Sequence, residues 1–217
     1  MVASHRPHPV HSLREAAGLF FRHTSPALLG LQFLAAAIAR ILAGPVSGTE
    51  AIVVAVVAVY WPLQEYALHR KMLHFRPRRW MGMKIDPLAS RYHRHHHRHP
   101  WELRYTFLPS RLIAMLIPIH VLVWWKAAPT WEIALTGIMV FGGATLSYEW
   151  IHFLTHTAYR PRTRWMRTVV RRHRWHHFKN ERYWFAFIVP MVDALFLTDP
   201  APADVATSPS CRDLETE

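Results

Sequence analysis

Two segments of the chain carry histidines at positions i, i+3 and i+4. The members are His93, His96, His97, His173, His176 and His177. The register of the first triplet has an alternative, because His95 and His99 lie beside its members. In a helix these positions share one face, so each triplet is expected to direct three imidazoles the same way. Neutral imidazole is a good ligand for iron, zinc, copper and nickel. Both triplets therefore predict transition-metal binding.

Two histidine pairs complete the set. His152 and His156 are four positions apart and share a helix face. His69 and His74 are five positions apart, which places them about 140° apart around a regular helix. This second pair can serve one metal only if the helix ends or distorts near His74; otherwise its members serve different metals. The pairs and triplets supply ten histidines, too many for one ion and suited to two.

The composition narrows the class of protein and of metal site. A chain of 217 residues with 51% hydrophobic content fits one domain with a sizeable core. The single cysteine, Cys211, lies in a polar C-terminal segment, which excludes disulfides and thiolate metal sites within the chain. Residues 1–11 are polar and rich in His and Pro, so a typical signal peptide is not expected.

Long apolar runs separate the histidine groups. They cover residues 27–43, 51–68, 112–125 and 131–154. Most are shorter than the ~20 residues that span a bilayer comfortably, so a soluble helical bundle is the alternative. The charge distribution favours a membrane, because eleven of the 26 Lys and Arg lie between His69 and Arg111 and nine between Arg160 and Arg182. Two membrane-crossing hairpins place both basic segments on one side, which the positive-inside rule assigns to the cytoplasm.

These observations predict an all-α integral membrane protein. Four transmembrane helices would form two hairpins, and a cytosolic helical cap would hold a histidine-rich di-metal site. Residues 1–25 are predicted to be an N-terminal cytosolic lead, residues 26–200 the membrane domain, and residues 201–217 a disordered, Pro-rich acidic tail. Helices two and four would carry one histidine pair each out of the membrane, and a slot beside the metals would open toward lipid.

The order and spacing of the four histidine groups resemble the fatty acid hydroxylase and sterol desaturase superfamily, nearest to its fatty acid 2-hydroxylase branch. The family pattern is His-x4-His, His-x2-His-His, His-x3-His and His-x2-His-His, in that order. Flanking residues also agree, at 65–70, at Tyr148-Glu149 and at His176-His177-Phe178. Residues 190–198 are similar to the closing Asp-x-x-Phe-Gly-Thr of the family, with Leu197 in place of Gly. The resemblance covers residues 50–200.

The resemblance implies a membrane-bound, O2-dependent, non-haem di-metal oxygenase that hydroxylates a lipid or fatty acyl C–H bond. Two iron ions would be the cofactors, with zinc able to replace them in purified protein, and O2 would be the co-substrate. The ten histidines would be the ligands, with no catalytic residue beyond them. Glu65, Tyr148, Glu149 and Asp193 are candidates for orienting the imidazoles, with packing as an equal alternative. The haem-binding domain of many eukaryotic members is not expected here, so a separate cytochrome b5-like or ferredoxin-like protein would supply electrons.

Several alternatives stay open. A carotenoid or sterol hydroxylase or desaturase of the same superfamily is the nearest rival, and the sequence does not separate hydroxylation from desaturation. A metal transporter or metal-binding membrane protein is the alternative of another class, although transporters place ionisable ligands near the membrane midplane. Nucleic-acid binding is not expected, because the positive charge more simply faces anionic lipid headgroups or an acidic electron donor.

Overall fold

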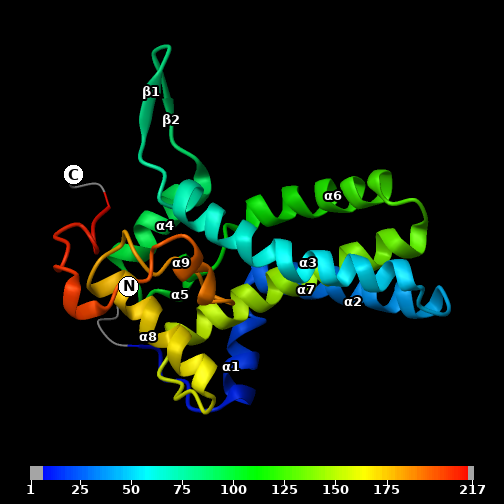
Figure 1. Ribbon diagram of the computed structural model, residues 1–217, viewed down its shortest axis with the longest axis horizontal. Coiled ribbons are helices and arrows are strands. Elements are labelled where there is room, and N and C mark those ends of the chain that lie inside the picture. The colour runs from blue at the N-terminus through cyan, green and yellow to red at the C-terminus, as the bar shows by residue number, and fades with distance from the viewer. Residues whose placement is uncertain (1–6, 215–217) are drawn as a thin grey trace.

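The computed structural model describes residues 7–214 and divides into an elongated helical bundle and a compact head (Figure 1). Four helices build the bundle: α2 (Thr24–Leu42), α3 (Gly48–Ala67), α6 (Ser110–Ala127) and α7 (Trp131–Thr155). They form two helical hairpins whose turns both lie at the end of the bundle far from the head (Figure 1). The predicted pair of helical hairpins is therefore present.

Local sequence signals set where these helices begin. The Ser47 side chain accepts a hydrogen bond from the Glu50 backbone N–H, and the Glu50 side chain accepts one from the Ser47 N–H, which makes a capping box at the start of α3. Thr130 caps α7 in the same way through the Ile133 N–H. Arg40, buried near the end of α2, makes an ion pair with Glu50 and so ties the two helices together beside their turn.

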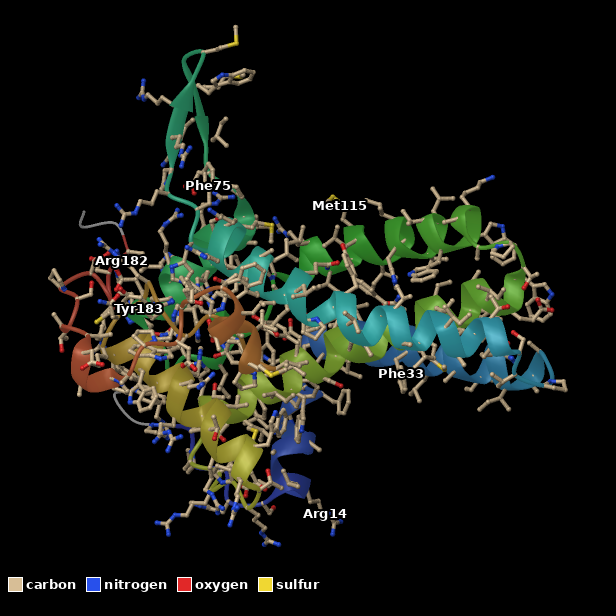
Figure 2. All side chains as sticks on the ribbon, viewed as in Figure 1. Arg14, Phe33, Phe75, Met115, Arg182 and Tyr183 are labelled. Carbon is tan, nitrogen blue, oxygen red and sulfur yellow. The ribbon has the colours of Figure 1, made fainter. Side chains whose placement is uncertain are left out.

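Three helical segments are long and apolar enough to cross a membrane: Thr24–Leu42, Gly48–Leu73 and Leu103–Ala127. Their outer faces expose large apolar side chains, such as Leu31, Ile52 and Met115, which is 54% exposed and is labelled on α6 in Figure 2. Such faces suit lipid rather than water. The chain is accordingly a multi-pass membrane protein with three spans supported by length and composition.

The fourth predicted span, α7, differs from the other three helices. It packs against α2, α3 and α6, and many of its residues are buried within the bundle. Gly142 and Gly143, which face Gln32 and Phe33 of α2, allow this close approach and also lower the apolar character of the helix. Whether α7 spans the membrane with the others stays a prediction, since its composition alone does not define it as a span.

The head contains shorter helices and one small sheet. The helical elements are α1 (Leu13–Phe20), the π-helix η1 (Leu68–Leu73), α4 (Leu88–Arg98), α5 (Leu103–Thr106), α8 (Arg164–Phe178), α9 (Met191–Leu195) and the 3-10 turn η2 (Pro202–Asp204). Strands β1 (Arg78–Trp80) and β2 (Met83–Ile85) pair antiparallel and form a hairpin that projects away from the head (Figure 1). The protein is thus mostly helical rather than purely helical, because Gly82 and Met81, both at positive φ, turn this segment back on itself.

The polar N-terminal lead is part of the head in its described portion. Ser12 caps α1, and Ala16 and Phe20 of that helix are buried in the main core. His8 pairs with Thr157 through an isolated bridge, just after the end of α7. Residues 1–6 of the predicted lead lie outside the described residues.

The predicted disordered tail is wrong for residues 201–214. Cys211 and Leu214 are buried, and the Ser208 N–H donates to the Lys179 carbonyl at 2.7 Å. The Ser208 and Ser210 hydroxyls both donate to the Glu181 carboxylate. These specific contacts order a segment whose composition alone indicates disorder, and residues 215–217 lie outside the described residues.

Candidate metal centre

A π-helix brings His69 and His74, which are five positions apart, close to each other. Residues 68–73 continue α3 with i→i+5 hydrogen bonds, and the His74 N–H donates to the His69 carbonyl at 3.3 Å. The ring centroids of His69 and His74 are consequently 5.2 Å apart. Of the two alternatives left open by the spacing, the structure shows the distorted helix, which brings both members of the pair to one cluster.

Five buried histidines from three helices form the first cluster. They are His96 of α4, His152 and His156 of α7 and its C-cap, and His173 and His177 of α8. One ring nitrogen of each lies within 4.8 Å of those of the others. The Nε2 atoms of His156 and His173 are 2.7 Å apart, and those of His152 and His96 are 3.1 Å apart. We call this set the α7 cluster.

The remaining five histidines form a second cluster beside the π-helix. His69, His74, His93 and His176 bring their ring nitrogens within 4.8 Å of one another. His97 joins them, because its Nε2 lies 3.1 Å from the His93 Nε2. The His74 Nε2 is 3.1 Å from the Nε2 atoms of both His93 and His176. We call this set the π-helix cluster.

Each histidine triplet divides between the two clusters. In α4, His93 and His97 belong to the π-helix cluster and His96 to the α7 cluster. In α8, His173 and His177 belong to the α7 cluster and His176 to the π-helix cluster. The expectation that all three members of a triplet point the same way is therefore wrong. The i and i+4 positions stay together, whereas the i+3 position, on the adjacent edge of the same face, reaches the neighbouring cluster.

Two further histidines in the same region lie outside both clusters. His95 is exposed and stacks on Tyr105, with ring centroids 4.9 Å apart. His99 lies close to Glu102 at the end of α4. These contacts place both residues away from the converging nitrogens and support the predicted register of His93, His96 and His97.

Hydrogen bonds at Nδ1 fix which nitrogen faces the π-helix cluster. The Nδ1 atoms of His69, His97 and His176 contact backbone carbonyl oxygens of Phe185, Cys211 and Tyr183, at 2.6, 2.9 and 2.8 Å. A carbonyl oxygen can only accept, so each Nδ1 carries the hydrogen. In a neutral ring the Nε2 atom is then a bare electron pair.

Bare nitrogens that converge in a dry interior need a cation between them. The Nε2 atoms of His69 and His177 are buried without a hydrogen-bond partner. Ligand nitrogens about 2.1 Å from a shared ion would lie roughly 3.0 to 3.4 Å from one another. Most of the observed Nε2 separations, at 3.1 to 3.2 Å, agree with this, and the 2.7 Å between His156 and His173 is shorter. The donor set, all imidazole, fits iron or zinc.

Burial keeps these imidazoles neutral and ready to bind. It lowers the pKa of His97 to about 3, chiefly by desolvation of the charged ring. It also lowers the pKa values of His96, His173, His176 and His177 well below the ordinary value, and neighbouring imidazoles lower them further. At neutral pH a metal ion would therefore meet little competition from protons at either cluster.

Two of the predicted orienting carboxylates bind backbone N–H groups near the imidazoles rather than the imidazoles themselves. Asp193 accepts hydrogen bonds from the backbone N–H groups of Phe185 and Ala186, at 2.9 and 3.0 Å. Glu65 accepts from those of Phe187 and Ile188, at 2.9 and 3.2 Å. Both carboxylates thus hold the loop whose Phe185 carbonyl orients His69.

The other two orienting candidates occupy different places. Glu149 accepts from the Leu108 N–H at 2.8 Å and from the Ser25 hydroxyl at 3.2 Å, which joins α7 to the starts of α2 and α6. Tyr148 packs its ring beside His152, with centroids 5.8 Å apart. Sequence reasoning missed the carbonyl oxygens of Tyr183, Phe185 and Cys211, because a backbone acceptor leaves no signal in residue type.

An apolar cavity of about 180 Å³ leads to the π-helix cluster. Residues of α2, α3, α6 and α7 line it, and His69 borders it at the head end. Leu68 and Leu116 also border it and are 40% and 42% exposed, so it opens at the outer surface of the bundle. The cavity thus connects the outer surface of the bundle with His69 of the π-helix cluster.

The fold and this site define a class: a helical membrane protein whose head gathers buried histidines that could hold two metal ions. A fatty acid hydroxylase family model matches residues 52–198 of the chain. The protein belongs to the fatty acid hydroxylase family.

Comparison with individual proteins agrees with this assignment. The chain is 27% identical over 150 residues to "Dihydroceramide fatty acyl 2-hydroxylase FAH2" of Arabidopsis thaliana, covering 69% of this chain and 61% of that protein. It is also 27% identical over 156 residues to "Dihydroceramide fatty acyl 2-hydroxylase FAH1" of Arabidopsis thaliana, covering 70% of this chain and 62% of that protein. The chain thus spans about three-fifths of the length of these relatives.

A solved structure shares the fold. The structure titled "Full length scs7p (only hydroxylase domain visible)" matches with a TM-score of 0.59 and 20% identity. The match covers 91% of this chain and 70% of that one. The likeness extends over bundle and head together.

Proposed function

We propose that the protein is a membrane-bound, O2-dependent oxygenase that hydroxylates a C–H bond of a lipid acyl chain at a pair of iron ions. The observation that carries this proposal is the apolar cavity, which opens toward lipid and ends at His69 of the π-helix cluster. An acyl chain in this cavity would lie beside a metal site while its remaining length stays in an apolar environment.

Each cluster would hold one ion through five imidazoles. The bound irons would supply the one-electron chemistry of oxygen that protein side chains do not perform. The protein's own part is to orient imidazoles, exclude water and position the chain. Tyr183, Phe185 and Cys211 hold three rings through their carbonyls, and Phe187 packs on the His173 ring at 4.3 Å and helps keep the site dry.

The overall reaction would consume O2, two electrons and two protons, and would return one hydroxyl on the lipid and one water. Electrons would come from a separate donor protein of the cytochrome b5 or ferredoxin kind. The basic residues of the head would attract an acidic donor and anionic lipid headgroups. The same charge supports a cytoplasmic position for the head, with α7 as the fourth span.

A metal transporter would need its ligands along a path through the bilayer. The ten histidines instead lie at the head ends of α3 and α7 and in α4 and α8, which supports the oxygenase. The dihydroceramide 2-hydroxylase names of the relatives support an acyl chain over a sterol or carotenoid as the substrate.

The test is incorporation of labelled oxygen. Protein reconstituted with Fe(II) in lipid nanodiscs would receive a reductase and ferredoxin, extracted membrane lipids and 18O2. We expect a hydroxylated acyl chain that contains one atom of 18O, and no such product from His176→Ala. Iron-loaded, reducible protein that forms no oxygenated lipid would contradict the proposal.

A further inference from the structure

A polar pair lies inside the otherwise apolar part of the cavity. The Gln32 side-chain amide on α2 contacts Nδ1 of His120 on α6, with the two nitrogens 2.7 Å apart. Both residues line the cavity that ends at His69. His120 is ten residues into α6, so it lies about 15 Å along the bundle from the start of that helix. The pair is therefore set back from the metal clusters, within a membrane-spanning segment.

The contact determines where the hydrogen on His120 sits. The amide nitrogen of Gln32 can only donate, so Nδ1 of His120 accepts. A neutral imidazole then carries its hydrogen on Nε2. That Nε2 atom is buried and has no hydrogen-bond partner among the described residues. An unpaired donor is unfavourable within the hydrocarbon region of a membrane.

Helix packing does not account for this second nitrogen. The hydrogen bond that joins α2 to α6 uses only Nδ1. The hydroxyl of Thr145, which also lines the cavity, donates to the Phe141 carbonyl and accepts from the Trp61 indole, and it makes no hydrogen bond with His120. Of the described side-chain nitrogen and oxygen atoms in the residues that line the cavity, two are buried without a partner: Nε2 of His69 and Nε2 of His120. A metal ion would account for the first, and an acceptor within the cavity would account for the second.

We propose that His120 binds an oxygen atom carried on the chain of the lipid substrate. The substrate class would be an acyl chain with a keto, ether or hydroxyl oxygen at a fixed distance from the carbon that is oxidised. This inference rests on the proposed function and deepens it. The hydrogen bond would set how deeply the chain enters, and hence which carbon lies beside the π-helix cluster.

The test measures binding and needs no turnover. The probes are stearic acids that carry one keto group at successive positions, with plain stearic acid as the reference. Calorimetry on metal-loaded, full-length protein in detergent would give each affinity. We expect one position, or two adjacent positions, to bind about tenfold more tightly than stearic acid. Equal affinity for every isomer would overturn the proposal, since a water molecule would then suffice as the partner.

Two variants identify the residue responsible. His120→Phe keeps an aromatic ring of similar size and removes the donor, so the preference among isomers should disappear. Gln32→Leu keeps the imidazole but removes the hydrogen bond that fixes its tautomer, so the preference should weaken. Bound metal per chain, which neither change should alter, reports correct folding. A preference that persists in folded His120→Phe would contradict the assignment.

The outcomes also separate this inference from the proposed function. An isomer preference in a protein that never oxygenates lipid would uphold the binding site and reject the oxygenase. Oxygenation of lipid without any isomer preference would uphold the oxygenase and reject the binding site at His120.

Discussion

The carbonyl oxygen of Phe185 lies 2.6 Å from Nδ1 of His69, and this contact joins two parts of the chain that are 116 residues apart. Since the carbonyl fixes the tautomer of the ring, Nε2 of His69 must face the π-helix cluster. The position of Phe185 therefore controls a metal ligand, and whatever holds Phe185 contributes to metal binding.

Asp193→Asn should weaken metal binding although Asp193 contacts no imidazole. Its Oδ1 accepts from the Phe185 N–H and the Thr198 hydroxyl, and its Oδ2 from the Ala186 N–H. An amide in its place presents one oxygen and an NH2 group that faces an N–H donor. We expect the apparent metal affinity to fall about ten- to hundredfold. Competition with a chelator measures this, and exposed Asp204→Asn serves as the control.

Removal of residues 201–217 should also weaken metal binding. The tail supplies the Cys211 carbonyl, which accepts from Nδ1 of His97 at 2.9 Å. Without it, His97 loses the bond that directs its Nε2, and the affinity of the π-helix cluster should fall roughly tenfold or more. A chain that ends at Leu214 keeps every tail contact described above and is the matched control. Equal metal affinity of both truncated chains would show that the tail does not support the site.

Gly137→Ala should destabilise the bundle. A Cβ at this position of α7 would overlap the indole of Trp124 on α6, so the indole or the two helices would have to shift. Overpacking of this kind costs about 1–3 kcal/mol, and the melting temperature in detergent should fall. Gly18→Ala on α1, where a Cβ meets nothing within 4 Å, should leave the melting temperature unchanged or raise it. An unchanged melting temperature for Gly137→Ala would mean that α6 and α7 do not pack this closely.

Spacing indicated which histidines could gather, and it showed that His69 and His74 could share a site only if the helix ended or was distorted near His74. It did not predict how they divide. His93 and His96 are three positions apart in one helix, yet they enter different clusters, because the cluster that each joins depends on how α4 crosses its neighbours. Crossing geometry arises from tertiary packing, which a single sequence does not express.

Composition misled at the ends of the chain. Residues 201–214 are polar and rich in Pro, which indicates disorder, but Glu181 gathers the Ser208 and Ser210 hydroxyls and Cys211 is buried. The burial of α7 against α2, α3 and α6 is likewise not expressed in its apolar run. Such differences depend on the partners of a segment, so they became visible only in the structure.

Metal content per chain tests the central claim, that ten histidines form two separate metal sites. Elemental mass spectrometry on detergent-purified protein loaded with Fe(II) should find two ions per chain. His74→Ala and His96→Ala remove one member from each cluster, so each variant should retain about one ion. His95→Ala, an exposed neighbour in α4, should retain two. A wild-type chain that never binds more than one ion, or single variants that keep both, would contradict the two-site arrangement.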